Sequence, residues 1–377
     1  MTRYSLILFF LYVCNSAFGQ DSLRFSGQLS LWGNASSGSD LPVWTGIRYI
    51  PQVNYEATSA SRTWFDGELS ANIFGSAGFN PFDTLTTSGN FKLYRTWIRL
   101  YTDQMELRLG LQKLNFGSAS LLRPLMWFDQ IDPRDPLQLT DGVWGMLARY
   151  YFLNNANIWL WGLYGNNERR GWELVPVNSK IPEFGGRLQV PVSKGELAFS
   201  YHHRVADSRD LEVNITEYEK IPENRFGLDA KMDFVTGLWF EGSFTHKGKN
   251  LGIMTNQLII NGGVDYTFAA GNGLYMAFEQ LMSTFDEKPF TFTHQTWFSL
   301  MTLSYPLGLL DKLSTIIYFN WSDNAVYSFL NWQRQYDRVM LYVMAYWNPD
   351  SFQLPTKVDA QNMFAGKGIQ IMFVFNH

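Results

Sequence analysis

Cysteine is almost absent from this chain of 377 residues. The sole cysteine, Cys14, lies within the first twenty residues. A chain without further cysteines forms no intramolecular disulfides, which argues against the small, disulfide-stapled class of secreted domain. Zinc-type ligand spacing is missing too, because His202 and His203 are adjacent and the other three histidines are isolated in the sequence.

Charge is also scarce. Asp, Glu, Lys and Arg make up 17% of the residues, against roughly a quarter in an ordinary soluble domain. The net charge of −4 leaves no basic excess, so no nucleic-acid partner is expected. Aromatic residues, in contrast, reach 17%. Little charge, many aromatics and a mean hydropathy close to neutral fit a protein that is apolar on one surface and polar on the other.

Long apolar runs are missing after the first residues. No later segment approaches about 18 consecutive apolar residues, which excludes a bundle of transmembrane helices. The first residues combine Arg3, an apolar stretch over 4–13 and the sequence Ala17-Phe18-Gly19. This order is typical of a signal peptide, so we expect 1–19 to be cleaved and the mature chain to begin at Gln20 or Asp21. Export without disulfides suits a bacterial envelope protein.

Apolar and polar residues alternate in pieces of roughly ten residues, as they do in membrane-barrel strands. At the end of the chain, Ile369, Ile371, Phe373 and Phe375 share one face, which we expect to contact lipid. The pattern predicts about eighteen strands, with sixteen as the alternative. They are expected near 23–34, 43–56, 60–74, 90–101, 104–114, 142–153, 157–166, 182–192, 195–206, 223–234, 237–247, 255–268, 272–282, 293–305, 312–322, 325–333, 337–347 and 367–377.

The connections between these strands alternate in length. Short turns such as "TDQ", "NNA" and "VTG" alternate with long segments such as 115–141, 167–181, 207–222 and 348–366. An even number of antiparallel strands with short turns at one end and long loops at the other is typical of outer-membrane barrels. We therefore predict one transmembrane antiparallel β-barrel over 20–377, with short periplasmic turns and long extracellular loops. A soluble β-sandwich also alternates, but it would not combine such aromatic faces with so little charge behind a secretion signal.

One stretch of about forty residues, 105–145, carries a more specific pattern. It contains Gly110, Gln112, Phe116 and Gly117, spaced as G-x-Q-x-x-x-[aromatic]-G, followed by "RPLMWFDQIDPRDP". This pattern resembles the porin-like barrels of Gram-negative outer membranes that include the alginate-export family and related porins. The resemblance implies an 18-stranded or similar barrel, a lumen lined by charged side chains and passive passage of solute.

The longest connection, 115–141, suggests a role. A barrel of about eighteen strands encloses a channel too wide for wall side chains to fill, so we predict that this loop folds inward and narrows it. Pro124, Pro133 and Pro136 would stiffen the loop because each restricts the backbone. Charge at the constriction would come from five loop residues, and we expect the two arginines to meet counter-charges of the barrel wall. The five are Arg123, Asp129, Asp132, Arg134 and Asp135.

Charged side chains on the predicted inward faces form two groups. Basic residues gather on the fourth to eighth strands, with Glu106 among them, and acidic residues gather on the eleventh to thirteenth. A basic wall opposite an acidic wall would create a transverse field in the pore. The same residues could instead pair as salt bridges that brace the barrel, and both roles stay open. The basic group is Arg95, Arg99, Arg108, Arg149 and Arg187, and the acidic group is Glu106, Glu241, Asp265 and Glu279.

Aromatic residues of the strands leave two interpretations open. Most Trp and Tyr clusters fit the girdles at the two membrane interfaces. In the expected register, however, Trp159, Trp161 and Trp297 face inward. They indicate either an error in that register or an apolar surface on which sugar rings could slide.

These patterns predict a porin-like channel for small hydrophilic or saccharide-like solutes in the cell outer membrane. Lipid is the expected environment, and a homo-oligomer or a partner protein of the envelope is possible. No cofactor and no metal site are expected, since the loop aspartates lack an EF-hand pattern. The alternatives are a non-conducting barrel that serves as a scaffold or partner and, least favoured, an outer-membrane enzyme, for which only His246 offers a candidate group.

Overall fold

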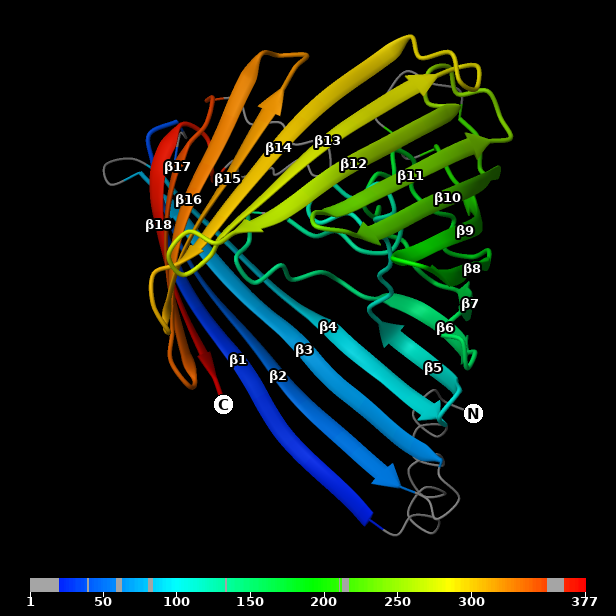
Figure 1. The fold of residues 1–377 in the computed structure, drawn as a ribbon, viewed down its shortest axis with the longest axis horizontal. Helices are drawn as coiled ribbons and strands as arrows, with labels where there is room; N and C mark the ends of the chain where they lie inside the picture. The colour runs from blue at the N-terminus through cyan, green and yellow to red at the C-terminus, as the bar shows by residue number, and fades with distance from the viewer. Residues whose placement is uncertain are drawn as a thin grey trace.

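The computed structural model describes residues 20–38, 41–58, 63–80, 84–132, 134–209, 211, 217–350 and 363–377. The expected signal peptide, 1–19, and Pro133 lie outside the described residues. Eighteen strands make up one sheet (Figure 1). They are β1 (Gln20–Ser36), β2 (Val43–Thr58), β3 (Trp64–Phe79), β4 (Leu85–Tyr101), β5 (Met105–Gln112), β6 (Val143–Tyr151), β7 (Asn157–Leu163), β8 (Glu183–Val192), β9 (Gly195–Ala206), β10 (Ile221–Asp233), β11 (Gly237–Lys247), β12 (Asn256–Phe268), β13 (Leu274–Asp286), β14 (His294–Pro306), β15 (Asp311–Asn320), β16 (Ala325–Gln335), β17 (Val339–Trp347) and β18 (Lys367–Asn376).

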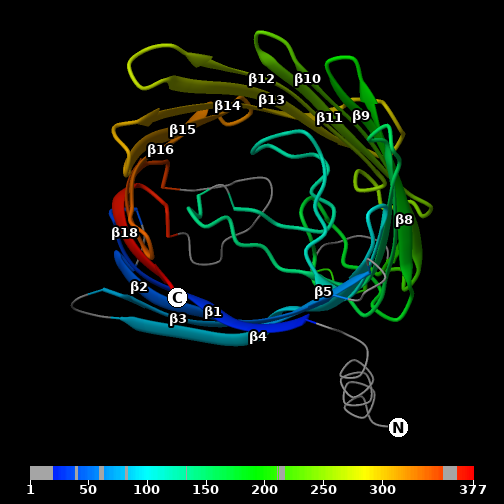
Figure 2. The same cartoon turned by 60° about the horizontal axis from the view of Figure 1, so that its bottom comes forward.

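The sheet closes on itself because β1 pairs on both sides. Ser30 lies opposite Arg48 of β2 and also opposite Val374 of β18, and both pairings are antiparallel. Figure 2 shows the resulting ring of strands. Closure gives the backbone N–H and C=O groups partners within the protein, which lipid cannot supply. The prediction of a closed antiparallel barrel of about eighteen strands is confirmed, and the alternative of sixteen is wrong.

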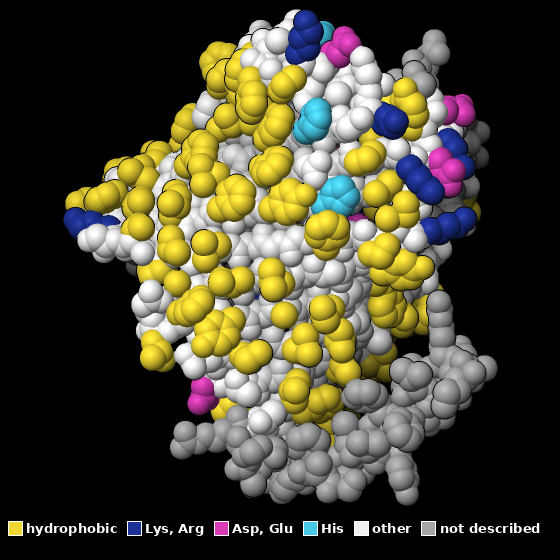
Figure 3. Space-filling view, turned by 90° about the vertical axis from the view of Figure 1, so that its right-hand side faces the viewer, with side chains coloured by type: hydrophobic (Ala, Val, Ile, Leu, Met, Phe, Trp, Pro, Cys, Tyr) yellow, Lys and Arg dark blue, Asp and Glu magenta, His cyan; other side chains and the backbone are white. Residues whose placement is uncertain are grey.

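Alternation along each strand separates an outer face from an inner face. On β18 the side chains of Ile369, Ile371 and Phe373 are 45%, 51% and 39% exposed, whereas Met372 and Val374 between them are 5% and 0% exposed. Figure 3 shows apolar side chains over much of one outward face, with few charged side chains among them. The outer face is thus suited to lipid, as the sequence pattern predicts.

The strand register corrects one expectation. Trp297 is 41% exposed on β14, while its neighbour Phe298 is buried. Trp297 therefore points outward, and the prediction that it faces inward is wrong. Trp161 of β7 is buried and does point into the barrel, where it stacks on Phe116 with ring centroids 5.5 Å apart.

Connections alternate in length around the ring. The short ones at one end are 59–63, 102–104, 152–156, 193–194, 234–236, 269–273, 307–310 and 336–338. At the other end the longest are 113–142, 164–182, 207–220 and 348–366, and the connection 321–324 is short. Within the described part of the chain, no helix has the length and apolar character needed to cross a membrane.

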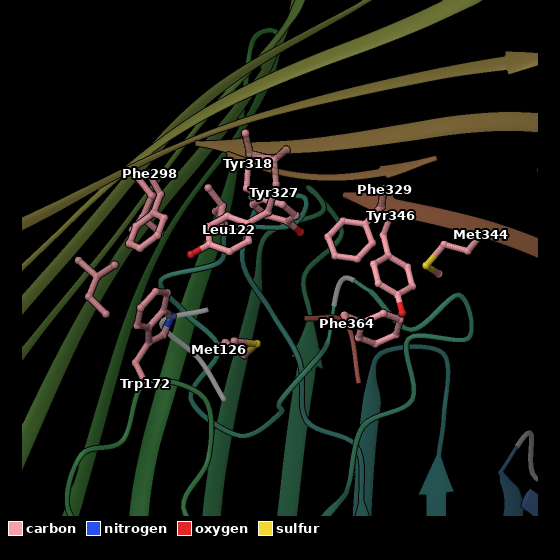
Figure 4. Packing of buried hydrophobic residues seen from close by; sticks show 13 residues of the cluster. Leu122, Met126, Trp172, Phe298, Tyr318, Tyr327, Phe329, Met344, Tyr346 and Phe364 are labelled. Atoms are coloured by element: carbon pink, nitrogen blue, oxygen red, sulfur yellow. The ribbon is translucent and has the colours of Figure 1, made fainter. Parts of the chain in front are cut away.

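Part of the barrel interior is a packed apolar core. The inner wall formed by β12 to β17 carries Ile259, Leu281, Phe298, Leu300 and Tyr318, all buried. Residues of the connections pack against this wall, as Figure 4 shows for Leu122, Met126 and Trp172. The resemblance noted above implies a lumen lined by charge, but this wall is apolar and covered by the chain itself.

Candidate functional site

The segment 113–142 between β5 and β6 runs inside the ring of strands (Figure 2). Its first turn meets the wall at Gly117, whose φ of 113° lies in a region that favours glycine. A Cβ on Gly117 would lie against the carboxylate of Glu241. That carboxylate accepts hydrogen bonds from the backbone N–H of Ala119 at 2.8 Å and of Leu125 at 2.6 Å. Glycine at 117 thus lets Glu241 bind the segment's backbone at close range.

A second carboxylate, Glu279 of β13, binds the same segment. It accepts hydrogen bonds from the backbone N–H groups of Ser120 at 2.7 Å, Leu121 at 3.2 Å and Leu122 at 2.8 Å. Asn261 of β12 completes the contact by donating to the carbonyl oxygen of Leu122. Hydrogen bonds from N–H groups to a carboxylate are charge-assisted and therefore strong. We call Glu241 and Glu279, with the amides of 119–125, the carboxylate clasp.

The clasp gives a structural role to two of the acidic residues that the sequence analysis selected. Glu241 and Glu279 are each 0% exposed, so they hold the backbone of 113–142 and present no carboxylate to a passing solute. Asp265 lies on β12, between the strands of the other two, and contacts a different group, since it accepts a hydrogen bond from the hydroxyl of Tyr275 at 3.1 Å. The acidic residues on β11 to β13 therefore do not act together as a free wall.

The arginines of the inward segment also have partners within it. Arg123 pairs with Asp129 at 3.0 Å and donates to the carbonyl oxygen of Phe116 at 2.8 Å. Arg134 pairs with Asp132 at 2.7 Å. Both of these ion pairs join residues of the segment itself, whereas the sequence analysis expected the counter-charges on the barrel wall. Burial raises the pKa of Asp129, although Arg123 and Lys113 oppose the shift.

The basic residues on β4 to β8 divide into two sets. Arg187 pairs with Asp229 of β10 at 2.5 Å. Asp229 also accepts a hydrogen bond from the hydroxyl of Ser118 at 3.0 Å. Arg95 donates to the carbonyl oxygen of Thr140 at 2.7 Å. Both arginines thus lie against the inward segment.

The other three basic residues lie nearer the short turns. Arg108 and Arg149 share Glu106, at 2.8 Å and 3.4 Å. Arg99 donates from Nε to Asp66 at 2.8 Å. The guanidinium of Arg149 also lies 3.7 Å from the ring centre of Trp159. Every predicted wall residue thus has an ionic or hydrogen-bonded partner, which favours a bracing role over two separate charged walls.

A larger buried ionic network escaped the sequence analysis. It joins the second inward connection, 164–182, to β8–β11. Arg204 pairs with Glu223 at 2.6 Å and with Glu173 at 3.1 Å, and Arg225 pairs with Glu173 at 2.8 Å. Burial alone would raise the pKa of Glu173, but the adjacent arginines hold it below its usual value. The sequence feature that could have indicated this network is the run of charges on the polar faces of β9 and β10. The remaining members are Arg170, Glu183, His202 and Lys247.

The interior of the barrel holds a cavity of about 630 Å³. It is lined by residues of β1–β6 and β18, by the later part of the inward segment and by 165–170. Among the described residues, its lining includes none of the nine predicted wall residues. It does include four predicted residues of the inward segment, namely Asp129, Asp132, Arg134 and Asp135. The sequence analysis did not select Arg48, Lys92 and Asp141, which also line the cavity.

A β-bulge shapes one side of this cavity. The register of β3 and β4 shifts between Ser70 and Ala71, which lie opposite Arg95 and Leu93, so Tyr94 is the extra residue. Tyr94 lines the cavity, and the guanidinium of Arg95 lies 4.0 Å from the centre of its ring. Bulges re-aim side chains in this way and are common beside functional sites. Single-sequence alternation does not reveal a bulge, so the inward orientation of Tyr94 was not foreseen.

Comparisons with known proteins agree with this architecture. No family model matches the chain, and no curated protein matches its sequence. OccAB1 of Acinetobacter baumannii superposes with a TM-score of 0.54 at 10% identity, covering 96% of this chain and 97% of that one. OccK5 of Pseudomonas aeruginosa gives 0.54 at 11% identity, with coverages of 94% and 98%. OmpT, an outer membrane protein of Vibrio cholerae in its trimer form, gives 0.51 at 12% identity, with coverages of 95% and 100%.

At these identities the likeness concerns the fold. The chain has the porin-type β-barrel fold of outer-membrane proteins, with eighteen strands. The closed sheet and the apolar outer face show that lipid surrounds it. Such barrels occur in outer membranes, and this is the location of the chain.

Proposed function

We propose that this chain is a porin-like channel for small hydrophilic or saccharide-like solutes, narrowed by the segment 115–141, and that it catalyses no reaction. One observation carries the proposal: the closed barrel retains a cavity of about 630 Å³ lined by charged, polar and aromatic side chains. Cavities of this size are within the range of sites that take small molecules. The resemblance of 105–145 to the alginate-export family supports a saccharide-like solute as one member of that class.

The proposed path is displaced from the barrel axis. On the side of β7 to β16, the interior is filled by the apolar core around Leu122 and Trp172 and by the ionic network around Arg204. The cavity lies on the opposite side, beside Trp32, Arg48 and Lys92. A solute that passes would therefore contact β2–β4 and the segment 128–142. It would not contact the carboxylate clasp.

The packed interior also favours a second candidate, a barrel that does not conduct. Two connections, 113–142 and 164–182, contact each other inside the ring, since Trp172 donates to the carbonyl oxygen of Arg123 at 2.8 Å. A barrel filled in this way could serve as a scaffold or as the partner of another envelope protein. The two candidates differ in one measurable property, the passage of ions.

Single-channel recording in planar bilayers decides between them. We expect discrete conductance steps from the purified, folded protein, and swelling of proteoliposomes in isotonic solutions of small sugars. The control is the same protein after heat unfolding, which should give neither signal. A folded preparation that inserts into bilayers yet conducts neither ions nor sugars would favour the non-conducting scaffold.

A further inference from the structure

The cavity is lined by charges of both signs, and its strand side is basic. The strand side contributes Arg48 from β2 and Lys92 from β4, with the neutral Asn72 between them on β3. The inward segment contributes four carboxylates and one cation, Arg134, which pairs with Asp132. The connection 164–182 adds Glu168, Arg169 and Arg170. Of the four carboxylates, Asp135 and Asp141 lie opposite the strand-side cations. A transverse field therefore crosses the cavity, but it arises from residues other than those that the sequence analysis selected.

Two ion pairs cross the cavity, and they differ in exposure. The Nη1 atom of Arg48 lies 3.8 Å from Oδ2 of Asp135, which is longer than a hydrogen bond. The side chains of Arg48 and Asp135 are 22% and 21% exposed. Within the described part of the chain, the buried Nε of Arg48 has no hydrogen-bond partner. Lys92 and Asp141 are in contact at 2.5 Å, but their side chains are 36% and 51% exposed. An exposed pair such as Lys92–Asp141 contributes little stability, and the long Arg48–Asp135 pair lacks a direct hydrogen bond, so a solute can compete for the partners of both.

An apolar surface lies beside these charges. Trp32, Phe74 and Met372 line the same cavity, together with Phe364. The guanidinium of Arg48 lies over the ring of Phe74, 5.2 Å from its centre. The cavity thus places a cation, a carboxylate and an apolar wall within reach of one small molecule.

We propose that this cavity selects small zwitterions with an apolar side chain, of the class of free amino acids and dipeptides. The solute carboxylate would bind Arg48 and Lys92, its ammonium group would bind Asp135 and Asp141, and its apolar side chain would lie on Trp32 and Phe74. A solute with one charge is attracted by one side and repelled by the other, whereas a zwitterion is attracted by both. This inference rests on the proposed channel function and narrows its solute class.

The test uses block of single-channel current by added solute. The probes are glycyl-leucine, its N-acetyl derivative, its amide, glycylglycine and glucose at equal concentration. We expect glycyl-leucine to block several-fold more strongly than either singly charged derivative. It should also block more strongly than glycylglycine, which lacks the apolar side chain.

Variants connect the preference to the two charges. Arg48→Gln and Asp135→Asn should each reduce the preference for glycyl-leucine over its derivatives to near unity. The double reversal Arg48→Asp with Asp135→Arg should restore it, because a zwitterion can bind in the opposite orientation. Arg334→Gln, which removes an outlying pair with Asp311 at 3.7 Å, is the matched control and should leave the preference unchanged. Heat-modifiable migration on gels checks that each variant is folded.

The outcomes separate this inference from the channel proposal. A wild-type protein that conducts ions and glucose but is blocked equally by all probes overturns the zwitterion site and leaves the channel standing. A double reversal that conducts but does not recover the preference also overturns it. Absence of any conductance contradicts the channel proposal, and the inference then falls with it.

Discussion

Buried carboxylates of this barrel act on backbone amides more than on solutes. Glu279 receives N–H groups from three consecutive residues, 120–122, and is fully buried. Removing a buried charged acceptor leaves its donors unsatisfied, at a cost of about 1–3 kcal/mol or more. The segment 113–142 therefore depends on this side chain for its position against β13.

Replacing Glu279 should loosen the inward segment without opening the barrel. We expect Glu279→Ala to increase single-channel conductance and its fluctuations, because the amides of 120–122 lose their acceptor. Glu279→Gln should have a smaller effect, since its amide oxygen can still accept. Glu68→Gln on β3, which is outside the clasp, is the control. Unchanged conductance in a folded Glu279→Ala protein would show that the segment does not limit the current.

Acidification should change the charge balance of the cavity through Asp135. Burial raises the pKa of this aspartate above its ordinary value, against hydrogen bonding from Leu137 and the charge of Arg48. Asp135 therefore becomes neutral at a higher pH than an exposed aspartate as the pH falls. The cavity becomes more positive, and its preference for anions should rise.

Reversal potentials in a salt gradient, recorded from pH 7 down to pH 4, measure this preference. The shift toward anions should be smaller in Asp135→Asn, which is neutral throughout. If the wild type and Asp135→Asn shift by the same amount over this range, the titrating group lies elsewhere.

Along a single strand, side chains alternate between the lipid-facing and the lumen-facing side of the barrel. On β18, Ile371 and Phe373 point outward while Gln370 and Met372 point inward. Because the period of a strand is two residues, a slip by one residue would exchange the lipid-facing and lumen-facing sets. Trp297 illustrates the point, since an error of one residue was enough to place it on the wrong side.

Arginine on the outer face of β18 should be costly. Near the middle of the membrane, Ile371→Arg or Phe373→Arg should destabilise the barrel by roughly 2–4 kcal/mol, because a charge enters lipid. Gln370→Arg on the inner face of the same strand is the matched control and should cost less. Urea unfolding in lipid vesicles gives the difference. Equal stability of Ile371→Arg and the wild type would mean that this part of β18 does not face lipid.

The barrel and its contents are held by different interactions. Strand pairing closes the ring through β1 and β18, whereas the interior is held by the carboxylate clasp, the apolar core and the ionic network. The pairing that closes the ring is between strands and does not involve the inward segment. The space inside, in contrast, is set almost entirely by that segment and by 164–182.

Shortening the inward segment should separate these two contributions. Deleting 121–131 should leave a folded barrel, because shortening a loop changes its closure entropy little. Some stability should be lost, since Leu281 and Leu300 lose their apolar cover. Conductance should rise clearly, because the deletion removes residues that fill the barrel interior and leaves the strands in place. A folded deletion variant with wild-type conductance would place the limiting constriction elsewhere in the barrel.

The strands and their two faces could be predicted from the order of residues alone, because both follow from local sterics and from burial at a period of two residues. That is why the closed eighteen-stranded barrel and the lipid-facing side chains of β18 were foreseen. A candidate list of charged inward residues followed from the same pattern, although their partners did not. The pairing of Arg134 with Asp132 was within local reach, being two residues apart, but the pattern gave no preference for it over a wall partner.

Only the tertiary structure decided which of these charges face the cavity. The amide of Ala119 and the carboxylate of Glu241 are far apart in the chain, and no local periodicity relates them. The bulge at Tyr94 and the packing of Leu122 on β12–β14 likewise depend on how the ring closes and on which wall is apolar. Long-range contacts are the interactions that a period of two cannot encode. For this reason the cavity beside Arg48 and Lys92 could not be predicted from the sequence pattern.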